Sequence, residues 1–175
     1  MAARISALSK SRGTDMSDPA WLVEAKKYEG LREILGAKHN NVILGWLRRL
    51  KAWWAEDETP WCGTFVAQCL QATGLPIAEN WFRAKEWAAY GSNLRSTHVA
   101  PGAILVFGRE GGGHVGFYVG EDSTYFYVLG GNQSNMVNIM KLAKVRCIAI
   151  RWPSGVPVIG GPVRLSGGKV SKNEA

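Results

Sequence analysis

The sequence has too few cysteines for a disulfide-stabilised protein, and its hydrophobic runs are too short for a membrane span or a signal peptide. Only 3 of its 175 residues are cysteine, which excludes a disulfide framework. No apolar run approaches the roughly 18 residues of a membrane span. The first 15 residues lack the apolar stretch of about 7–15 residues that a signal peptide contains. Hydrophobic residues make up 46% of the chain and charged residues 20%, so we expect one folded globular domain.

The charge balance and the aromatic residues indicate what kind of partner to expect. Lys and Arg number 21 against 14 Asp and Glu, a net charge of +7 that favours an acidic partner such as nucleic acid, an anionic membrane or a cell-wall polymer. The basic residues are dispersed and no nucleic-acid-binding motif accompanies them, so nucleic acid is not the expected partner. The 8 tryptophans are consistent with either a large hydrophobic core or a surface that binds a polymer.

The order of the predicted elements defines the fold class. Helical patterns come first and short β-prone runs, separated by Gly, Asp and Asn, follow. The short connections between these runs predict an antiparallel sheet, and hence an α+β domain with N-terminal helices packed on one face of a central antiparallel sheet. The expected helices cover residues 19–30, 41–54, 59–73 and 84–90. The expected strands cover residues 103–107, 114–119, 125–129, 137–142 and 145–152.

Both ends of the chain differ in composition from this domain, which we place at residues 16–153. Residues 1–15 are basic and polar and predict a disordered extension, or a misplaced start with Met16 as the alternative initiator. A basic arm that contacts an anionic partner is the other interpretation. Residues 154–175 are rich in Gly, Pro and Ser and predict a loosely held tail.

The segment DETPWCGTFVAQCLQATG places a cysteine at the start of a helix. Thr59 is expected to cap this helix, with Pro60 in its first position and Cys62 in its first turn. Unpaired N–H groups and the helix dipole there lower a thiol pKa and can stabilise an oxyanion. The alternative is that Cys62 is simply a small buried residue, as we expect Cys69 and Cys147 to be. The cysteines contain no close ligand pair, so no metal site is predicted.

A thiol nucleophile needs a base, and the chain offers three histidines. His39 lies in a polar loop, where we expect it to be solvated, and His98 lies in a turn-like setting before a strand. His114 opens GHVGFYVG directly after a run of glycines, which let a substrate or another backbone come close. We therefore favour His114 as the general base. The alternative is a hydrogen-bonded structural histidine at a strand end.

The end of the following strand, LGGNQSN, offers a third polar group. On an adjacent antiparallel strand, Asn132 could lie level with His114 and fix the tautomer of its imidazole. Gln133 and Asn135 are rival candidates. Gly-Asn pairs are also common turn formers, which gives Asn132 a purely structural alternative.

Together these residues form the order Cys, His, Asn of papain-type enzymes. The chain resembles the NlpC-type and CHAP-type (cysteine, histidine-dependent amidohydrolase/peptidase) cell-wall hydrolases through the stretches DETPWC, GHVGFYVG, LGGNQ and RWP. The resemblance extends from about residue 21 to residue 153. It implies a papain-like fold with Cys62 as nucleophile, His114 as base and Asn132 as the orienting residue, and it requires no metal or cofactor.

Three further residues in these motifs are candidates for auxiliary roles. Glu58 either positions the cysteine loop, binds substrate, or only complements a helix N-terminus. Trp61 either lines the cleft or packs in the core. Gln133 is the remaining candidate, as a substrate-binding or auxiliary residue.

The resemblance implies a monomeric peptidoglycan amidase or endopeptidase, of the phage endolysin or virion-associated type. Such an enzyme would be made in the cytoplasm without a signal peptide. It would reach the wall through a holin, or by delivery from a virion or secretion system. Its basic surface would hold an anionic wall or membrane. The alternative is a non-enzymatic phage tail or wall-binding module on the same fold.

Overall fold

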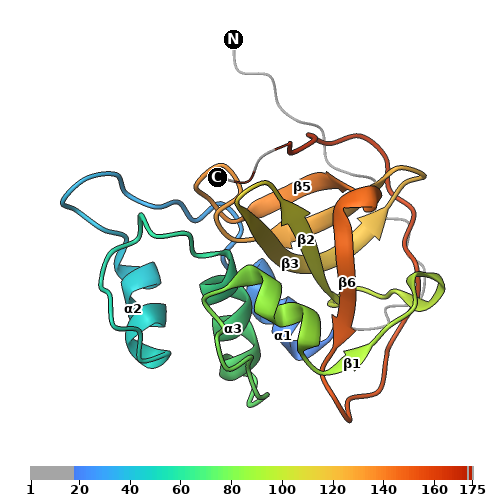
Figure 1. Cartoon of the computed structure of the whole chain (residues 1–175), viewed down its shortest axis with the longest axis horizontal. Helices are drawn as coiled ribbons and strands as arrows, with labels where there is room; N and C mark the ends of the chain where they lie inside the picture. Colours follow the sequence, from blue (N-terminus) through green and yellow to red (C-terminus); the bar gives the residue numbers. More distant parts are fainter. Residues whose placement is uncertain (1–17, 173, 175) are drawn as a thin grey trace.

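The computed structural model describes residues 18–172 and residue 174, and it has the predicted α+β architecture (Figure 1). The predicted extension at residues 1–15 lies outside these residues. The helices are α1 (Ala20–Lys26), α2 (Asn41–Arg49) and α3 (Cys62–Ala72), with the 3-10 helices η1 (Ala84–Ala89), η2 (Ser96–His98) and η3 (Lys144–Arg146). The strands are β1 (Ser92–Asn93), β2 (Ile104–Arg109), β3 (Gly112–Glu121), β4 (Tyr125–Gly130), β5 (Asn138–Ala143) and β6 (Cys147–Trp152).

The strands form one antiparallel sheet in the order β1-β6-β2-β3-β4-β5. The three strands β2, β3 and β4 are consecutive in both sequence and space, because short turns connect them. Their register pairs Phe107 with His114 and Phe117 with Leu129. The end of β4 therefore lies next to the start of β3, where the favoured histidine stands.

Helix α3 lies between α2 and the sheet (Figure 1). Phe65 on this helix packs against Phe117 of β3 on one side, with ring centroids 6.2 Å apart, and against Trp46 of α2 on the other, at 5.8 Å. Every residue from Cys62 to Leu70 is buried. Large apolar side chains on both faces thus fix the position of α3, and with it the position of its first residue.

The starts of two helices differ from the sequence prediction. Helix α3 begins at Cys62 rather than near Thr59, and its N-cap residue, Trp61, makes no side-chain capping bond. Thr59 instead donates from its backbone and its hydroxyl to the carboxylate of Glu56, which closes a turn before the helix. Helix α1 begins at Ala20 with Pro19 as its N-cap residue. The prediction of a cap at Thr59 was therefore wrong, but Cys62 still stands in the first turn.

The C-terminal segment is held more closely than its composition predicts. It pairs with the end of β3 through the backbone of Glu121, and with β5, an edge strand, through the backbone of Lys141. Glu174 is 2% exposed, and its carboxylate receives two hydrogen bonds from Arg146, at 2.9 and 2.8 Å. These bonds join residues that are far apart in the sequence, so no local sequence pattern predicts them. They also cover part of an open sheet edge.

Helices in the described part of the chain are all too short or too polar to cross a bilayer. The three cysteines are free thiols, with Cys69 fully buried and Cys147 partly buried. Within residues 18–172 and 174, no group of three or more His, Cys, Asp or Glu side chains could hold a metal ion.

Candidate active site

The thiol of Cys62 lies where the start of α3 meets strand β3. The backbone N–H of Val115 is within hydrogen-bonding reach of the thiol, as are the N–H groups of Gly63 and of Cys62 itself. Val115 directly follows His114 on β3. The fold therefore places Cys62 beside Val115, the neighbour of His114 on this strand. Cys62 and His114 are 52 positions apart in the sequence.

The acidity of the thiol differs from the sequence expectation. Cys62 is only 7% exposed, and burial raises the pKa of its thiol. The N–H groups and the positive charge of Arg109 act in the opposite direction, but they are the smaller effects. The expected lowering was wrong because it considered the helix terminus alone, without the desolvation that the surrounding elements impose. In the resting molecule the sulfur is therefore a neutral thiol at pH 7.

His114 has the protonation state that a general base needs. Its side chain is 1% exposed, and burial lowers its pKa to about 4. The imidazole is consequently neutral at pH 7 and can accept a proton. The other two histidines lie elsewhere: exposed His98 pairs with Thr97, and His39 pairs with Asp57. The expectation that His39 is solvated is correct only in part, because its side chain is 25% exposed and contacts the buried Asp57 carboxylate.

Gln133 is the residue that the structure brings to the imidazole. Its Oε1 lies 2.9 Å from Nε2 of His114, and its side chain is completely buried. Its Nε2 donates to the carbonyl oxygens of Val128 and Asn138, at 3.1 and 2.7 Å, and faces Oδ1 of Asn138 at 2.9 Å. Three oxygens around one amide nitrogen fix the amide orientation, so the oxygen must face the histidine.

This arrangement also determines the tautomer of His114. An amide oxygen can only accept, so Nε2 of His114 carries the hydrogen and Nδ1 carries the free lone pair. The nitrogen that can take a proton is therefore Nδ1. The position expected for Asn132, with Gln133 and Asn135 as rivals, is therefore occupied by Gln133.

Asn132 has a different place in the structure. Its backbone adopts a left-handed conformation with φ 56°, in a turn where Ser134 and Asn135 also have positive φ values. Asparagine tolerates this conformation better than most residues. The preceding Gly131 allows the turn to approach Trp61, because a Cβ at this glycine would lie 2.8 Å from the Trp61 ring. The structural alternative considered for the Gly-Asn pair thus describes what is observed at Asn132.

An acidic residue outside the expected set of site residues organises the loop beside the site. Asp57 is completely buried. Its carboxylate accepts from the backbone N–H groups of Ile34 and Asn40, at 2.9 and 2.7 Å, and contacts Nδ1 of His39 at 2.9 Å. These bonds lower its pKa against the effect of burial, so Asp57 is ionised. The only signal in the sequence was its position in the DETPWC stretch.

Neighbouring side chains extend this network toward the cysteine. Glu58 accepts from the backbone N–H of Gly36 at 2.8 Å. Trp61 is 1% exposed, and its Nε1 donates to Glu33 at 3.0 Å. Trp61 thus packs in the core directly before Cys62, and Glu58 holds the loop that faces this segment.

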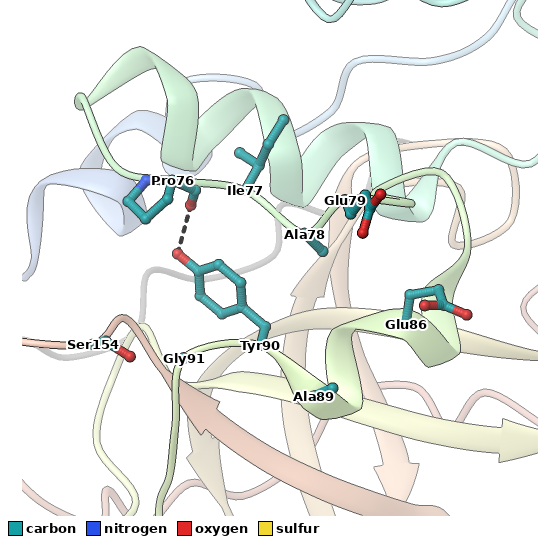
Figure 2. A pocket seen from close by; sticks show the side chains of 9 residues that line it. All are labelled: Pro76, Ile77, Ala78, Glu79, Glu86, Ala89, Tyr90, Gly91 and Ser154. Atoms are coloured by element: carbon teal, nitrogen blue, oxygen red, sulfur yellow. Dashed lines mark hydrogen bonds between the residues drawn. The ribbon is translucent and has the colours of Figure 1, made fainter.

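A separate surface pocket lies near the other end of α3 (Figure 2). Tyr90 fills one side of it, and its hydroxyl donates to the carbonyl oxygen of Pro76 at 2.6 Å. Burial raises the pKa of Tyr90 to about 12, so this group stays a neutral donor. The nine residues that line the pocket include none of Cys62, His114 and Gln133, so these candidate residues lie outside the pocket.

The buried histidine predicts a pH dependence of stability. Its pKa is about 4 in the folded chain against an ordinary value of 6.5, so the unfolded chain binds more protons between these values. The free energy of unfolding should reach its maximum above about pH 7.5 and be about 2 kcal/mol lower at pH 5. Urea denaturation at these two pH values measures the difference.

A His114→Asn variant is the control for this prediction, since it removes the titrating group. Its stability should change much less over the same interval, where most carboxylates stay ionised. Equal slopes in the variant and the parent protein would contradict the assignment of a buried neutral imidazole.

Comparison with known proteins gives one family match. The CHAP domain family model matches residues 54–132, a span that contains Cys62 and His114 and ends one residue before Gln133. No curated protein gives a significant match. CHAP domains are generally hydrolases of the cell wall, often dependent on a cysteine, with peptidoglycan as substrate. Residues 54–132 of this chain are therefore similar to CHAP domains, which have a papain-like fold.

Proposed function

We propose that this chain is a peptidoglycan amidase or endopeptidase that works through Cys62, His114 and Gln133. The observation that carries the proposal is the His114–Gln133 hydrogen bond, which leaves Nδ1 of a neutral imidazole free to act as base. His114 directly precedes Val115, whose backbone N–H is within reach of the Cys62 thiol at the start of α3. His114 was favoured as base and Cys62 as nucleophile from the sequence. Gln133 replaces Asn132 as the proposed orienting residue.

The first half of the proposed reaction breaks the amide bond. Nδ1 of His114 takes the proton of the Cys62 thiol as the sulfur attacks the amide carbon of the substrate. The N–H groups around the start of α3 stabilise the negative charge that develops on the carbonyl oxygen. The imidazolium then gives its proton to the leaving nitrogen, the C–N bond breaks, and a thioester remains on Cys62.

The second half releases the acid product. His114 takes a proton from water, and the resulting hydroxide attacks the thioester carbon. The C–S bond breaks, and the imidazolium returns the proton to the sulfur. Throughout, the Gln133 oxygen holds the imidazole in one orientation and stabilises its charged form. The high resting pKa of the thiol means that proton transfer accompanies attack, rather than preceding it.

Purified sacculi incubated with the protein in H₂¹⁸O test this proposal. Mass spectrometry should find soluble fragments with one new amine, and one new carboxyl group that carries a single ¹⁸O atom. Labelled reducing-end sugars would contradict it by identifying a glycosidase. Protein that binds sacculi and releases nothing would instead support the non-enzymatic wall-binding module. A monomeric state and delivery by a holin, a virion or a secretion system stay predictions.

A further inference from the structure

The tryptophans of this chain divide into a buried majority and one exposed side chain. Six of the eight are buried in the structure: Trp21, Trp46, Trp61, Trp81, Trp87 and Trp152. Trp54 is half-buried, whereas Trp53 is 76% exposed. Most tryptophans therefore build the core, and Trp53 is the one that packing does not explain.

Trp53 belongs to a cluster of four aromatic rings, which we call the aromatic platform: Trp53, Trp54, Trp81 and Phe82. The Trp53 ring lies edge-to-face against Trp54 and Phe82, with centroids 4.7 and 4.8 Å away. Trp54 stacks on Trp81 at 5.6 Å, and Trp81 is 7% exposed. A buried ring thus anchors the exposed one, so Trp53 presents its indole in a fixed orientation.

The platform lies next to the nucleophile. The Trp81 carbonyl oxygen packs so closely on Gly63 that a Cβ there would lie 2.2 Å from it. Gly63 directly follows Cys62. The loop that carries Trp53 and Trp54 runs directly into α3, whose first residue is Cys62. The backbone of one platform segment therefore packs on the first turn of α3, and the other platform segment precedes this helix in the chain.

Positive side chains lie between the platform and the base. The Arg83 guanidinium stands 5.6 Å from the centroid of the Phe82 ring. Lys85 runs past Gly113, where a Cβ would lie 2.8 Å from its Cγ, and Gly113 directly precedes His114. Both side chains are exposed. A substrate with an apolar ring face at the platform and carboxylates toward His114 would find complementary groups along this path.

We propose that the aromatic platform is a subsite for a sugar ring of the peptidoglycan glycan strand. This rests on the proposed function, since peptidoglycan offers sugars joined through an amide to peptides that carry carboxylates. The C–H face of a pyranose packs on an indole while its hydroxyls stay in water, so an exposed, pre-oriented tryptophan suits it. Because the platform adjoins Cys62, the amide that is cut is the one joining the glycan to its peptide, rather than a cross-bridge bond.

Ligand binding to a Cys62→Ala variant tests the subsite without any need for turnover. The probes are peptide-free glycan strands and the free stem peptide, followed by tryptophan fluorescence. Glycan strands should produce a saturable change, and an added Trp53→Ala substitution should weaken their binding about tenfold or more. Val145→Ala is the matched control, because Val145 is 95% exposed and lies on η3, outside the cluster. No glycan binding, or binding that survives Trp53→Ala, would overturn the proposal.

Cleavage by the active protein tests the choice of amide. Glycan strands with attached peptides should be cut at the sugar–peptide junction, and Trp53→Ala should slow this reaction about tenfold. Cross-linked peptides without sugars should be poor substrates, whatever residue stands at position 53. Efficient cutting of sugar-free peptides would overturn the subsite while leaving the hydrolase intact. Glycan binding at Trp53 by a protein that cuts nothing would support the subsite and overturn the proposed function.

Discussion

Replacing Cys62 with alanine is expected to lower the release of fragments from sacculi by about 10⁴-fold or more. The substitution removes the sulfur atom that forms the proposed thioester, and the buried imidazole cannot activate water in the same position as effectively. The side chain is small, so the loss of its sulfur should destabilise the fold by only about 1 kcal/mol. Initial rates on sacculi and a denaturation curve, measured together, separate the two effects.

Cys69→Ala is the matched control for this substitution. Cys69 lies on the same helix, is completely buried and carries a thiol whose pKa burial raises strongly. Its replacement should cost a similar amount of stability and leave the rate within a few-fold of the parent protein. Comparable activity in the Cys62→Ala and Cys69→Ala variants would remove Cys62 from the mechanism.

The second large effect concerns the choice between Gln133 and Asn132. Gln133→Ala should lower kcat/KM by about 10²-fold, because His114 loses the acceptor that holds its tautomer and stabilises its charged form. Asn132→Gly should stay within a few-fold of the parent rate, since glycine adopts the left-handed backbone of that position freely. The ratio of these two rates measures which amide serves the histidine.

Gln133→Glu distinguishes orientation from mere packing at this position. The carboxylate keeps an acceptor for Nε2, and its negative charge favours the imidazolium, so the pKa of His114 should rise above its value of about 4. The acid limb of the pH–rate profile should move to higher pH accordingly. An Asn132→Gly variant as impaired as Gln133→Ala, or an unmoved acid limb in Gln133→Glu, would argue against the assignment.

The sheet could be predicted from the sequence because its signals are local. Glycine and polar residues interrupt the β-prone runs, so the predicted strands around His114 and after Tyr125 overlap the observed ones. Helix α3 was predicted for the same reason, although its start was placed too early. The Thr59 hydroxyl found a partner in Glu56 instead of capping the helix, and either bond fits the same sequence.

The parts of the site that could not be predicted depend on distant residues. The choice of Gln133 over Asn132 follows from the φ angle of one residue and from carbonyl oxygens on β4 and β5 that enclose the amide of the other. The raised pKa of Cys62 follows from burial by elements on both sides of α3. Neither the position of Gln133 nor the raised pKa of Cys62 can be predicted from a short stretch of sequence.

The most direct test of the account is to trap the covalent intermediate on Cys62. Protein mixed with glycan-linked peptide fragments and quenched in acid within the first turnovers should yield a thioester adduct. Peptide mapping by mass spectrometry should place it on the peptide containing Cys62, hydroxylamine should release it, and the Cys62→Ala variant should lack it. Continued turnover with no adduct on Cys62, or an adduct on another residue, would contradict the mechanism.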